Sequence, residues 1–184
     1  MPQADRSAIL APGANYGADG PLLMYAGLAV RRRGGRTRPV VWDLPRTTDL
    51  SQLRERVVSQ VESAIDEMTA ATGTAPVVIG KSLGSLAAPL VADRGLAAVW
   101  FTPLLKDEAT VAALGRAAGP CLLVGGTADQ LWDGQIARSL SRDVVEIDDA
   151  DHRMFVPGPL SASAAALGQV ITAVEDFLDH RVWP

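Results

Sequence analysis

Short apolar runs recur along the chain, and none of them alternates with polar residues. Continuous apolar runs with β-branched residues are typical of strands that are buried on both faces of a parallel sheet. The runs are SAILAP (7–12), RPVVWD (38–43), APVVIG (75–80), LAAVWF (96–101), PCLLVGG (120–126) and DVVEID (143–148). The pattern therefore predicts six strands.

Helical patterns fill the segments between these runs. Over residues 49–73, apolar residues recur every three or four positions, and Gly73 ends the pattern. The helix expected over 21–35 has Pro21 in its first turn and paired glycines at its end. Further helices are expected over 83–95, 107–119, 132–140 and 161–181.

The alternation of strand and helix predicts the class of fold. It favours a three-layer, doubly wound α/β sandwich around a mainly parallel six-stranded sheet. The 184 residues can form one domain with a substantial core, and no linker, repeat or low-complexity segment divides them. We expect a single domain over 1–184.

Composition and charge exclude several classes of function. A net charge of −4 and a pI near 5.1 give no reason to expect nucleic acid as a partner. Cys121 is the only cysteine, so an intrachain disulfide is impossible. The N-terminus lacks a secretory pattern and no apolar run is long enough to span a membrane, so a cytoplasmic protein is expected. The sequence does not indicate an oligomeric state.

One local bias in charge interrupts this balance. The segment RRRGGRTR (31–38) holds five arginines. Cations favour the C-terminal end of a helix, and Gly34-Gly35 would stop that helix. We therefore interpret the run as a helix terminus, in preference to a site for an acidic partner or a nucleic-acid patch.

The segment VVIGKSLGSLAAPLV (77–91) allows two interpretations. Gly80-Lys81-Ser82 resembles the end of a phosphate-binding loop, which requires G-x-x-x-x-G-K-[ST]. Ala75 stands where that motif needs its first glycine, and the residues in between have the pattern of a strand. A nucleotide site is therefore not expected.

The second interpretation is a G-x-S-x-G elbow over residues 80–84, in which a strand turns sharply into a helix at Ser82. Small residues on both sides of the serine let the strand and the helix pass each other. The N–H of Leu83 would then face a developing oxyanion at the start of the helix. A turn with a helix-capping serine is the alternative.

The rest of the chain supplies partners for this serine. In such a fold the acid and the histidine follow in that order, each after a later strand. VGGTADQLWD places Asp129 after the fifth strand, and EIDDADHRMF places His152 after the sixth. His180 is expected to be solvated or to cap its helix. Alternative candidates for the acid are Asp107, Asp133 and Asp151.

With these motifs the chain resembles the α/β-hydrolases, especially small lid-less members near the dienelactone hydrolases. The resemblance is carried by Gly80-Lys81-Ser82-Leu83-Gly84, GGTADQ around Asp129 and ADH at His152, and it spans nearly the whole chain. It implies the strand order 2-1-3-4-5-6 with the elbow strand central. The first antiparallel strands of the family are expected to be missing. Lys81 receives no role, because that position varies in the family.

The resemblance also implies the remaining parts of a site. The second oxyanion donor is expected in APGANYG, at the N–H of Ala14 or, as second choice, Asn15. Loop aromatics either line an acyl pocket or pack at its rim. They are Tyr16, Trp132 and Phe155. Between residues 101 and 120 there is room for only one helix, so an open site without a lid is expected.

These features predict a serine hydrolase that cleaves a small ester, thioester or lactone through an acyl-enzyme. Ser82 would be the nucleophile, His152 the general base and acid, and Asp129 the orienting acid. The expected partner is a small acyl substrate, with no cofactor, no metal and no membrane. An acyltransferase or a lyase- or cyclase-like enzyme with the same triad, and a non-catalytic binding module, are the alternatives.

Overall fold

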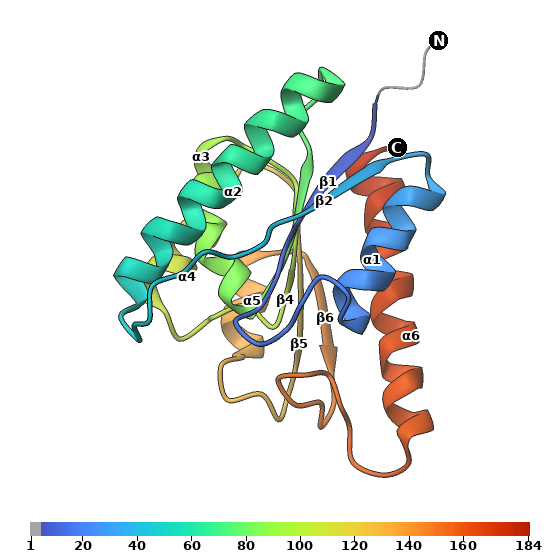
Figure 1. The fold of residues 1–184 in the computed structure, drawn as a ribbon. Helices are drawn as coiled ribbons and strands as arrows, with labels where there is room; N and C mark the ends of the chain where they lie inside the picture. The colour runs from blue at the N-terminus through green and yellow to red at the C-terminus, as the bar shows by residue number, and fades with distance from the viewer. Residues whose placement is uncertain (1–4) are drawn as a thin grey trace.

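A six-stranded sheet forms the centre of the protein in the computed structural model, which describes residues 5–184 (Figure 1). Its order is β2-β1-β3-β4-β5-β6, and all five pairings between the strands are parallel. This is the strand order that the resemblance to the α/β-hydrolases implies, with β3, the strand before Ser82, at the centre. The strands are β1 (Ser7–Ala11), β2 (Arg36–Pro39), β3 (Val77–Lys81), β4 (Ala98–Phe101), β5 (Cys121–Gly126) and β6 (Asp143–Ile147).

Helices cover both faces of this sheet and give the predicted three layers (Figure 1). One face carries α1 (Pro21–Arg32) and α6 (Leu160–Phe177), and α6 continues into the short η2 (Leu178–Val182). The other face carries α2 (Leu50–Thr72), η1 (Ser82–Ala87), α3 (Ala88–Asp93), α4 (Glu108–Gly115) and α5 (Gly134–Leu140). No helix within residues 5–184 is both long and apolar enough to cross a membrane.

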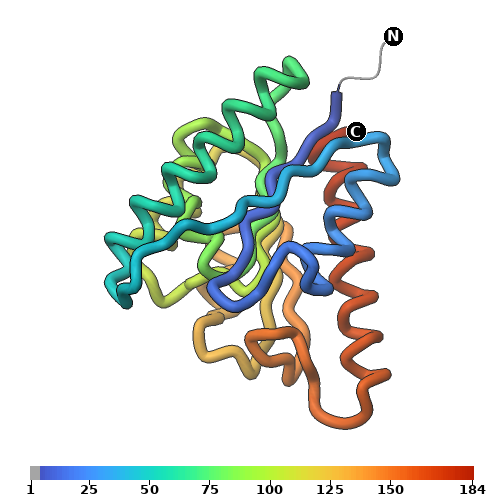
Figure 2. The backbone as a smooth tube through the Cα atoms, viewed as in Figure 1, coloured from blue at the N-terminus to red at the C-terminus, as the bar shows by residue number. Residues whose placement is uncertain are grey.

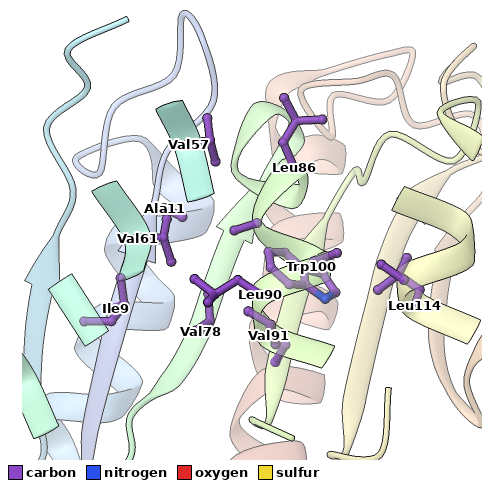
Figure 3. Close-up of a cluster of buried hydrophobic side chains, with 14 of the residues drawn as sticks. Ile9, Ala11, Val57, Val61, Val78, Leu86, Leu90, Val91, Trp100 and Leu114 are labelled. Carbon is purple, nitrogen blue, oxygen red and sulfur yellow. The ribbon is translucent and has the colours of Figure 1, made fainter. Parts of the chain in front are cut away.

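The two layers of helices enclose two separate hydrophobic cores. The larger core lies beneath α2 to α5 and includes Trp100, which is 1% exposed (Figure 3). The second lies beneath α1 and α6 and includes Phe101, which is fully buried. Because successive residues of a strand point to opposite faces, β4 supplies one large aromatic to each core. The same alternation decides which way Gly80 and Lys81 point on β3.

The second strand is shorter and lies earlier than predicted. β2 is Arg36–Pro39, whereas the pattern indicated a buried strand over 38–43. It forms the edge of the sheet, where arginines and a proline discourage pairing with another chain. The apolar run after it leaves the sheet: Val40 is buried, but Val41 is 86% exposed. An edge strand needs no apolar side chains on both faces, which is why hydrophobicity alone misplaced it.

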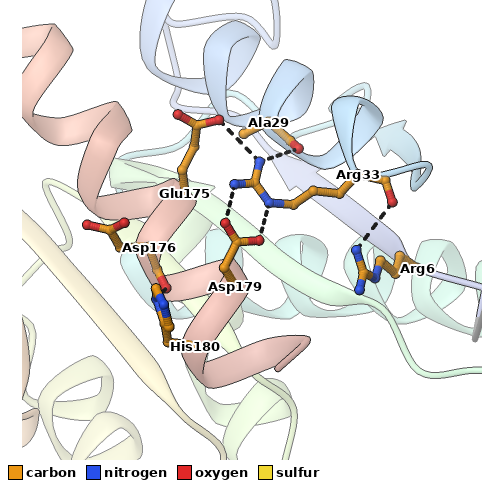
Figure 4. Close-up of polar contacts among 7 residues, drawn as sticks. All are labelled: Arg6, Ala29, Arg33, Glu175, Asp176, Asp179 and His180. Atoms are coloured by element: carbon orange, nitrogen blue, oxygen red, sulfur yellow. Dashed lines mark hydrogen bonds and ion pairs between the residues drawn. The ribbon is translucent and has the colours of Figure 1, made fainter.

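The arginine run forms the predicted C-terminal end of a helix. Arg31 and Arg32 complete the last turn of α1, and Gly34 follows with a φ of 75°. Arg33 joins α1 to the C-terminal helix: its guanidinium donates to both carboxylate oxygens of Asp179 at 2.6 Å and to Glu175 at 3.2 Å (Figure 4). These hydrogen bonds raise the pKa of Arg33.

The loops that carry the predicted site lie at one end of the sheet. In parallel sheets the carboxyl ends of the strands share one edge, and ligand sites form there. Figure 2 shows the segments after β1, β5 and β6 at the lower end of the view, away from the C-terminus. Residues far apart in the sequence therefore meet at this edge.

Candidate active site

Ser82 stands at a sharp turn between β3 and η1. Its φ is +50°, a left-handed conformation that residues with a side chain rarely adopt. Two glycines make the turn possible. A Cβ on Gly80 would lie 2.4 Å from the ring of Trp100, and one on Gly84 would lie 2.2 Å from the carbonyl oxygen of Ala11. The packing of G-x-S-x-G is thus the close approach of strand and helix that the motif predicts.

Ser85 fixes the turn from within the protein. It is fully buried, and its hydroxyl donates to the carbonyl oxygen of Ser82 at 2.6 Å while accepting the N–H of Leu104 at 3.1 Å. The elbow is therefore tied to the segment after β4. Sequence reasoning missed this role, since a serine in a small-residue run gives no indication of its partners.

His152 and Asp129 complete a chain of hydrogen bonds that begins at Ser82. The Nε2 atom of His152 lies 2.9 Å from Oγ of Ser82, and its Nδ1 atom lies 2.8 Å from Oδ2 of Asp129. The other carboxylate oxygen of Asp129 accepts the N–H of Leu131 at 2.9 Å. The Asp129 side chain is 1% exposed, whereas that of His152 is 33% exposed. A buried carboxylate thus orients an imidazole that remains open on its other side.

The other acids considered from the sequence have different partners. Asp107 caps α4 and pairs with Arg54, and Asp133 caps α5. Asp151 shapes the loop around His152: its carboxylate accepts the N–H groups of Arg153 and Phe155. Only Asp129, among the four candidates, is bonded to His152.

Two further candidates for acid–base or nucleophilic chemistry lie elsewhere. Nδ1 of the exposed His180 donates to the carbonyl oxygen of Asp176 near the end of the C-terminal helix (Figure 4). Cys121 is the first residue of β5 and therefore lies at the end of the parallel strands opposite to Ser82. Burial raises the pKa of the Cys121 thiol to about 12, which keeps it a poor nucleophile.

The predicted oxyanion donors come from two turns. Leu83 is the second residue of η1, a position whose N–H has no partner within the helix. Ala14 is the second residue of a tight turn closed by the hydrogen bond from Gly13 N–H to the carbonyl oxygen of Tyr16, at 3.0 Å. Ala14 and Asn15 are both exposed at this turn. The turn that spans residues 13–16 is called the oxyanion turn below.

An apolar pocket of about 280 Å³ opens beside these loops. Tyr16, from the oxyanion turn, and Phe155, from the loop after His152, both line it, as the sequence suggested. Trp132 does not. It lies beneath the opposite face of the sheet, is 6% exposed, and donates its ring N–H to Glu146 at 2.6 Å. Trp132 is therefore not part of this pocket, and its surroundings fit the packing interpretation of the two that the sequence left open. The pocket is completed by Pro21, Leu22, Arg153, Met154, Leu160, Ser163, Ala164 and Leu167.

Lys81, the residue before the serine, is a further residue to which the sequence pattern assigned no role. Lys81 is only 3% exposed, and its ammonium lies 5.1 Å from the centre of the Tyr16 ring. A signal was present in the sequence. Gly80 faces Trp100 in the larger core, so the next residue on this central strand must point into the opposite layer. A lysine at that position is necessarily buried.

Comparisons with solved structures identify the fold. A protein described as a hydrolase of the α/β superfamily, from Xanthomonas campestris pv. campestris, is 23% identical, with a TM-score of 0.65 over 95% of this chain and 98% of its own. Dienelactone hydrolase from Anabaena variabilis is 20% identical, with a TM-score of 0.68 over 98% and 88%. Est1E from Butyrivibrio proteoclasticus is 12% identical, with a TM-score of 0.72 over 98% and 90%. No family model and no curated protein matches the sequence.

The chain thus has the α/β-hydrolase fold. Within that fold it is similar to compact members, which include a serine hydrolase without a lid from Xanthomonas campestris, 14% identical with a TM-score of 0.65 over 97% of this chain and 84% of its own. In agreement with this likeness, only α4 separates β4 from β5. At these identities the likeness establishes the architecture, whereas the chemistry has to be argued from the site.

Proposed function

We propose that the protein is a serine hydrolase that cleaves a small ester, thioester or lactone through an acyl-enzyme. The observation that carries the proposal is the continuous chain from Ser82 Oγ through the His152 ring to buried Asp129, with both contacts under 3 Å. A strained serine, a base in contact with it and an acid behind the base together form the arrangement that activates a hydroxyl. That many of the similar structures are hydrolases supports this choice.

The reaction would proceed in two halves. Ser82 Oγ attacks the acyl carbon while its proton passes to Nε2 of His152, and the carbonyl oxygen becomes an oxyanion near the N–H groups of Leu83 and Ala14. The intermediate collapses, the bond to the leaving group breaks, and His152 returns its proton to that group. Water then attacks the acyl carbon and gives a proton to His152. The bond from the acyl carbon to Ser82 Oγ breaks, and His152 returns the proton to that oxygen, which releases the acid and free Ser82.

Asp129 would stay ionised throughout the reaction. Its two oxygens accept from His152 and from Leu131, so that the imidazole keeps its Nδ1 proton and presents a bare Nε2 atom to Ser82. Its burial also stabilises the imidazolium that forms after the first proton transfer. This carboxylate therefore orients His152 and does not itself accept the proton.

The pocket beside Tyr16 supports a substrate with an apolar part. Its walls are mostly carbon, and Ser163, its buried hydroxyl, is already bonded to the backbone of Val156. Phe155 and Leu160 are 49% and 79% exposed at its border, so apolar side chains continue from the pocket to the surface. At protein packing density this volume can hold roughly ten carbon atoms.

Two alternatives share the same residues. An acyltransferase would pass the acyl group to an alcohol or amine, and a binding module would form no acyl-enzyme. Hydrolysis is favoured because His152 is one-third exposed, which admits water to the base that must activate it. Partition of the acyl group between water and added alcohols measures the first alternative.

Steady-state and burst kinetics with p-nitrophenyl esters test the proposal. The wild type should release a burst of p-nitrophenol of about one equivalent if deacylation is slower than acylation. Ser82→Ala should lose at least about 10³-fold in kcat/KM. Turnover that is the same in the folded Ser82→Ala variant would overturn the assignment of the nucleophile.

A chain-length series tests the pocket. With p-nitrophenyl esters from acetate to dodecanoate, kcat/KM should rise about threefold to fourfold per methylene, and the rise should stop at about ten carbons. Ala164→Phe, which fills the pocket, should move the optimum to shorter chains. Ala165→Phe is the matched control, because Ala165 is exposed on α6 but does not line the pocket. An unchanged optimum in Ala164→Phe would remove the pocket from the account.

A further inference from the structure

A lysine is buried directly beside the serine without a carboxylate partner. Among residues 5–184, no Asp or Glu oxygen lies within ion-pair distance of the Lys81 ammonium, although the side chain is only 3% exposed. A buried cation is costly unless something compensates it. The proposed reaction assigns it no proton to move, so its retention beside the site calls for a different role.

The contacts of Lys81 converge on the oxyanion turn. Its ammonium lies 5.1 Å from the centre of the Tyr16 ring, within the range of a cation–π interaction. Its methylene stem passes close to Gly13: a Cβ built on that glycine would lie 3.2 Å from Cδ of Lys81. One side chain thus touches both residues that close the turn, Gly13 and Tyr16.

Tyr16 is itself held on its other sides. Its hydroxyl oxygen accepts the N–H of Leu22 at 2.8 Å, and its ring packs so closely on Gly20 that a Cβ there would lie 2.4 Å away. The ring is therefore fixed between the start of α1 and the lysine beneath it. The position of Ala14, which lies between Gly13 and Tyr16, follows from these contacts.

We propose that Lys81 is a positioning residue that holds the oxyanion turn in its productive geometry through its charge on the Tyr16 ring and its stem against Gly13. This inference rests on the proposed function, since the turn matters for catalysis only if Ala14 donates to an oxyanion. It adds a residue that neither the triad nor the fold requires. Among residues 5–184, the Lys81 ammonium forms no hydrogen bond with the serine hydroxyl or the imidazole, and it acts through the turn.

The charge on Lys81 depends on pH in a useful range. Burial lowers the pKa of Lys81 to about 8 from its ordinary value of 10.5; nearby Asp129 opposes this shift, Arg153 adds to it, and Asp151 opposes it. Burial raises the pKa of Tyr16, a shift that the Leu22 N–H opposes and Asp19 supports, so the phenol stays neutral while the lysine titrates. The cation–π contact is therefore present below about pH 8 and is lost as the pH rises through that value.

Loss of the Lys81 charge should raise the stability of the fold while it lowers the activity. The pKa of Lys81 is lower in the folded protein than in the unfolded chain, so the unfolded chain binds this proton more tightly. The resulting loss of stability is complete below about pH 8 and disappears as the pH rises through the ordinary lysine value. Removing the charge should stabilise the protein at pH 7, whereas a merely structural lysine would destabilise it on removal.

Lys81→Met tests the role, because methionine keeps an unbranched stem and has no charge. We expect kcat at pH 7 to fall about 3- to 30-fold, KM to change less than about twofold, and the midpoint of thermal unfolding to rise by several degrees. Lys106→Met is the matched control. Lys106 is the only other lysine of the chain and is exposed, so neither quantity should change appreciably.

The pH profile supplies the decisive comparison. Wild-type kcat should fall as the pH rises through about 8. The kcat of Lys81→Met should be low both below and above pH 8 and should not show that fall. Lys81→Arg restores a cation that stacks on aromatic rings and does not lose its proton in this range. It should recover most of the rate at pH 7 and show no fall near pH 8. Equal rates and profiles in all three forms would overturn the inference.

A measurement without substrate separates this inference from the proposed function. The amide of Gly13 donates to the carbonyl oxygen of Tyr16, so its hydrogen exchange reports whether the turn is held. Exchange should be faster in Lys81→Met than in the wild type and in Lys106→Met. If the protein proves not to be a hydrolase, this result still stands. If the Gly13 amide exchanges at the same rate in the wild type, Lys81→Met and Lys106→Met while wild-type turnover is confirmed, Lys81 does not position the turn.

Discussion

The backbone of Ser82 is the most informative residue-scale feature of this molecule. A positive φ at a residue with a side chain costs on the order of 1–3 kcal/mol and persists only where the surroundings enforce it. Here Gly80 and Gly84 allow the approach and Ser85 holds the carbonyl oxygen. The strain places the hydroxyl 2.9 Å from His152 instead of into the helix.

Asp129→Asn tests whether Asp129 orients the His152 ring or only packs against it. The amide has the same shape but can present an N–H to His152, which favours the wrong tautomer. We expect kcat to fall about 10²- to 10⁴-fold in esterase assays, with little change in the free energy of unfolding. Asp133→Asn is the control, since Asp133 caps α5 and pairs with exposed Lys106 but does not contact His152, and asparagine caps helices equally well. Comparable rates in both variants would exclude Asp129 as the orienting acid.

The contact between Ser82, His152 and Asp129 was easier to predict from the sequence than the precise shape of the pocket. The three residues follow successive strands of a parallel sheet, and the structure brings them within hydrogen-bond distance of one another. Trp132 was misplaced because a loop aromatic carries no indication of the face it will join; its ring N–H found Glu146 beneath the other layer. Lys81 was assigned no role because the residue at this position of the motif varies in the family. The alternation of side chains along β3 would have shown that Lys81 is buried.

At the scale of elements, the contact between β1 and η1 sets the geometry of the elbow. Gly84→Ala places a methyl group 2.2 Å from the carbonyl oxygen of Ala11, so strand and helix must separate. We expect the free energy of unfolding to fall by about 1–3 kcal/mol in chemical denaturation, together with a loss of activity. The elbow would then be disturbed without any change to Ser82 itself.

Gly168→Ala is the control for this change. Gly168 lies within α6, and a Cβ built there meets nothing within 4 Å. Alanine should therefore stabilise the helix by up to about 1 kcal/mol through its higher propensity. If the two alanines shifted stability in the same direction, close packing would not be the reason for glycine at position 84.

The elements themselves followed closely from the hydrophobic pattern, with one instructive exception. Central strands such as β3 and β5 are buried on both faces, which is the condition under which continuous apolar runs predict strands. The edge strand β2 does not meet that condition, so its position came out several residues too late. Pattern-based reasoning fails where burial no longer dictates composition.

At the scale of the whole molecule, Arg33 links the first and the last helix. Its side chain is 15% exposed, and it bridges to Asp179 and Glu175, more than 140 residues further along the chain. The contact lies near the end of α1 that points away from the loops of the site (Figures 1 and 4). It should therefore contribute to stability without affecting catalysis.

Arg33→Ala should lower the free energy of unfolding by about 1 kcal/mol, because its partners are partly exposed and solvent screens the pair. The pKa of Asp179 is held below its ordinary value by Arg33, so this contribution is present at neutral pH and is lost as the pH falls through the lowered value. Denaturation curves at neutral and acid pH measure the difference. Arg32→Ala is the control, because Arg32 is exposed. A loss of esterase rate in folded Arg33→Ala would show that the contact between Arg33 and the C-terminal helix affects the site.

The central claim is that Ser82 is an activated nucleophile, and labelling with a fluorophosphonate probe tests it most directly. Folded wild type and His152→Ala are incubated with the probe, and peptide mass spectrometry locates the adduct. We predict one adduct on Ser82 in the wild type and little or none on the same time scale in His152→Ala. A folded wild type that forms no adduct, or one that is labelled at Ser82 equally well without His152, would contradict the account.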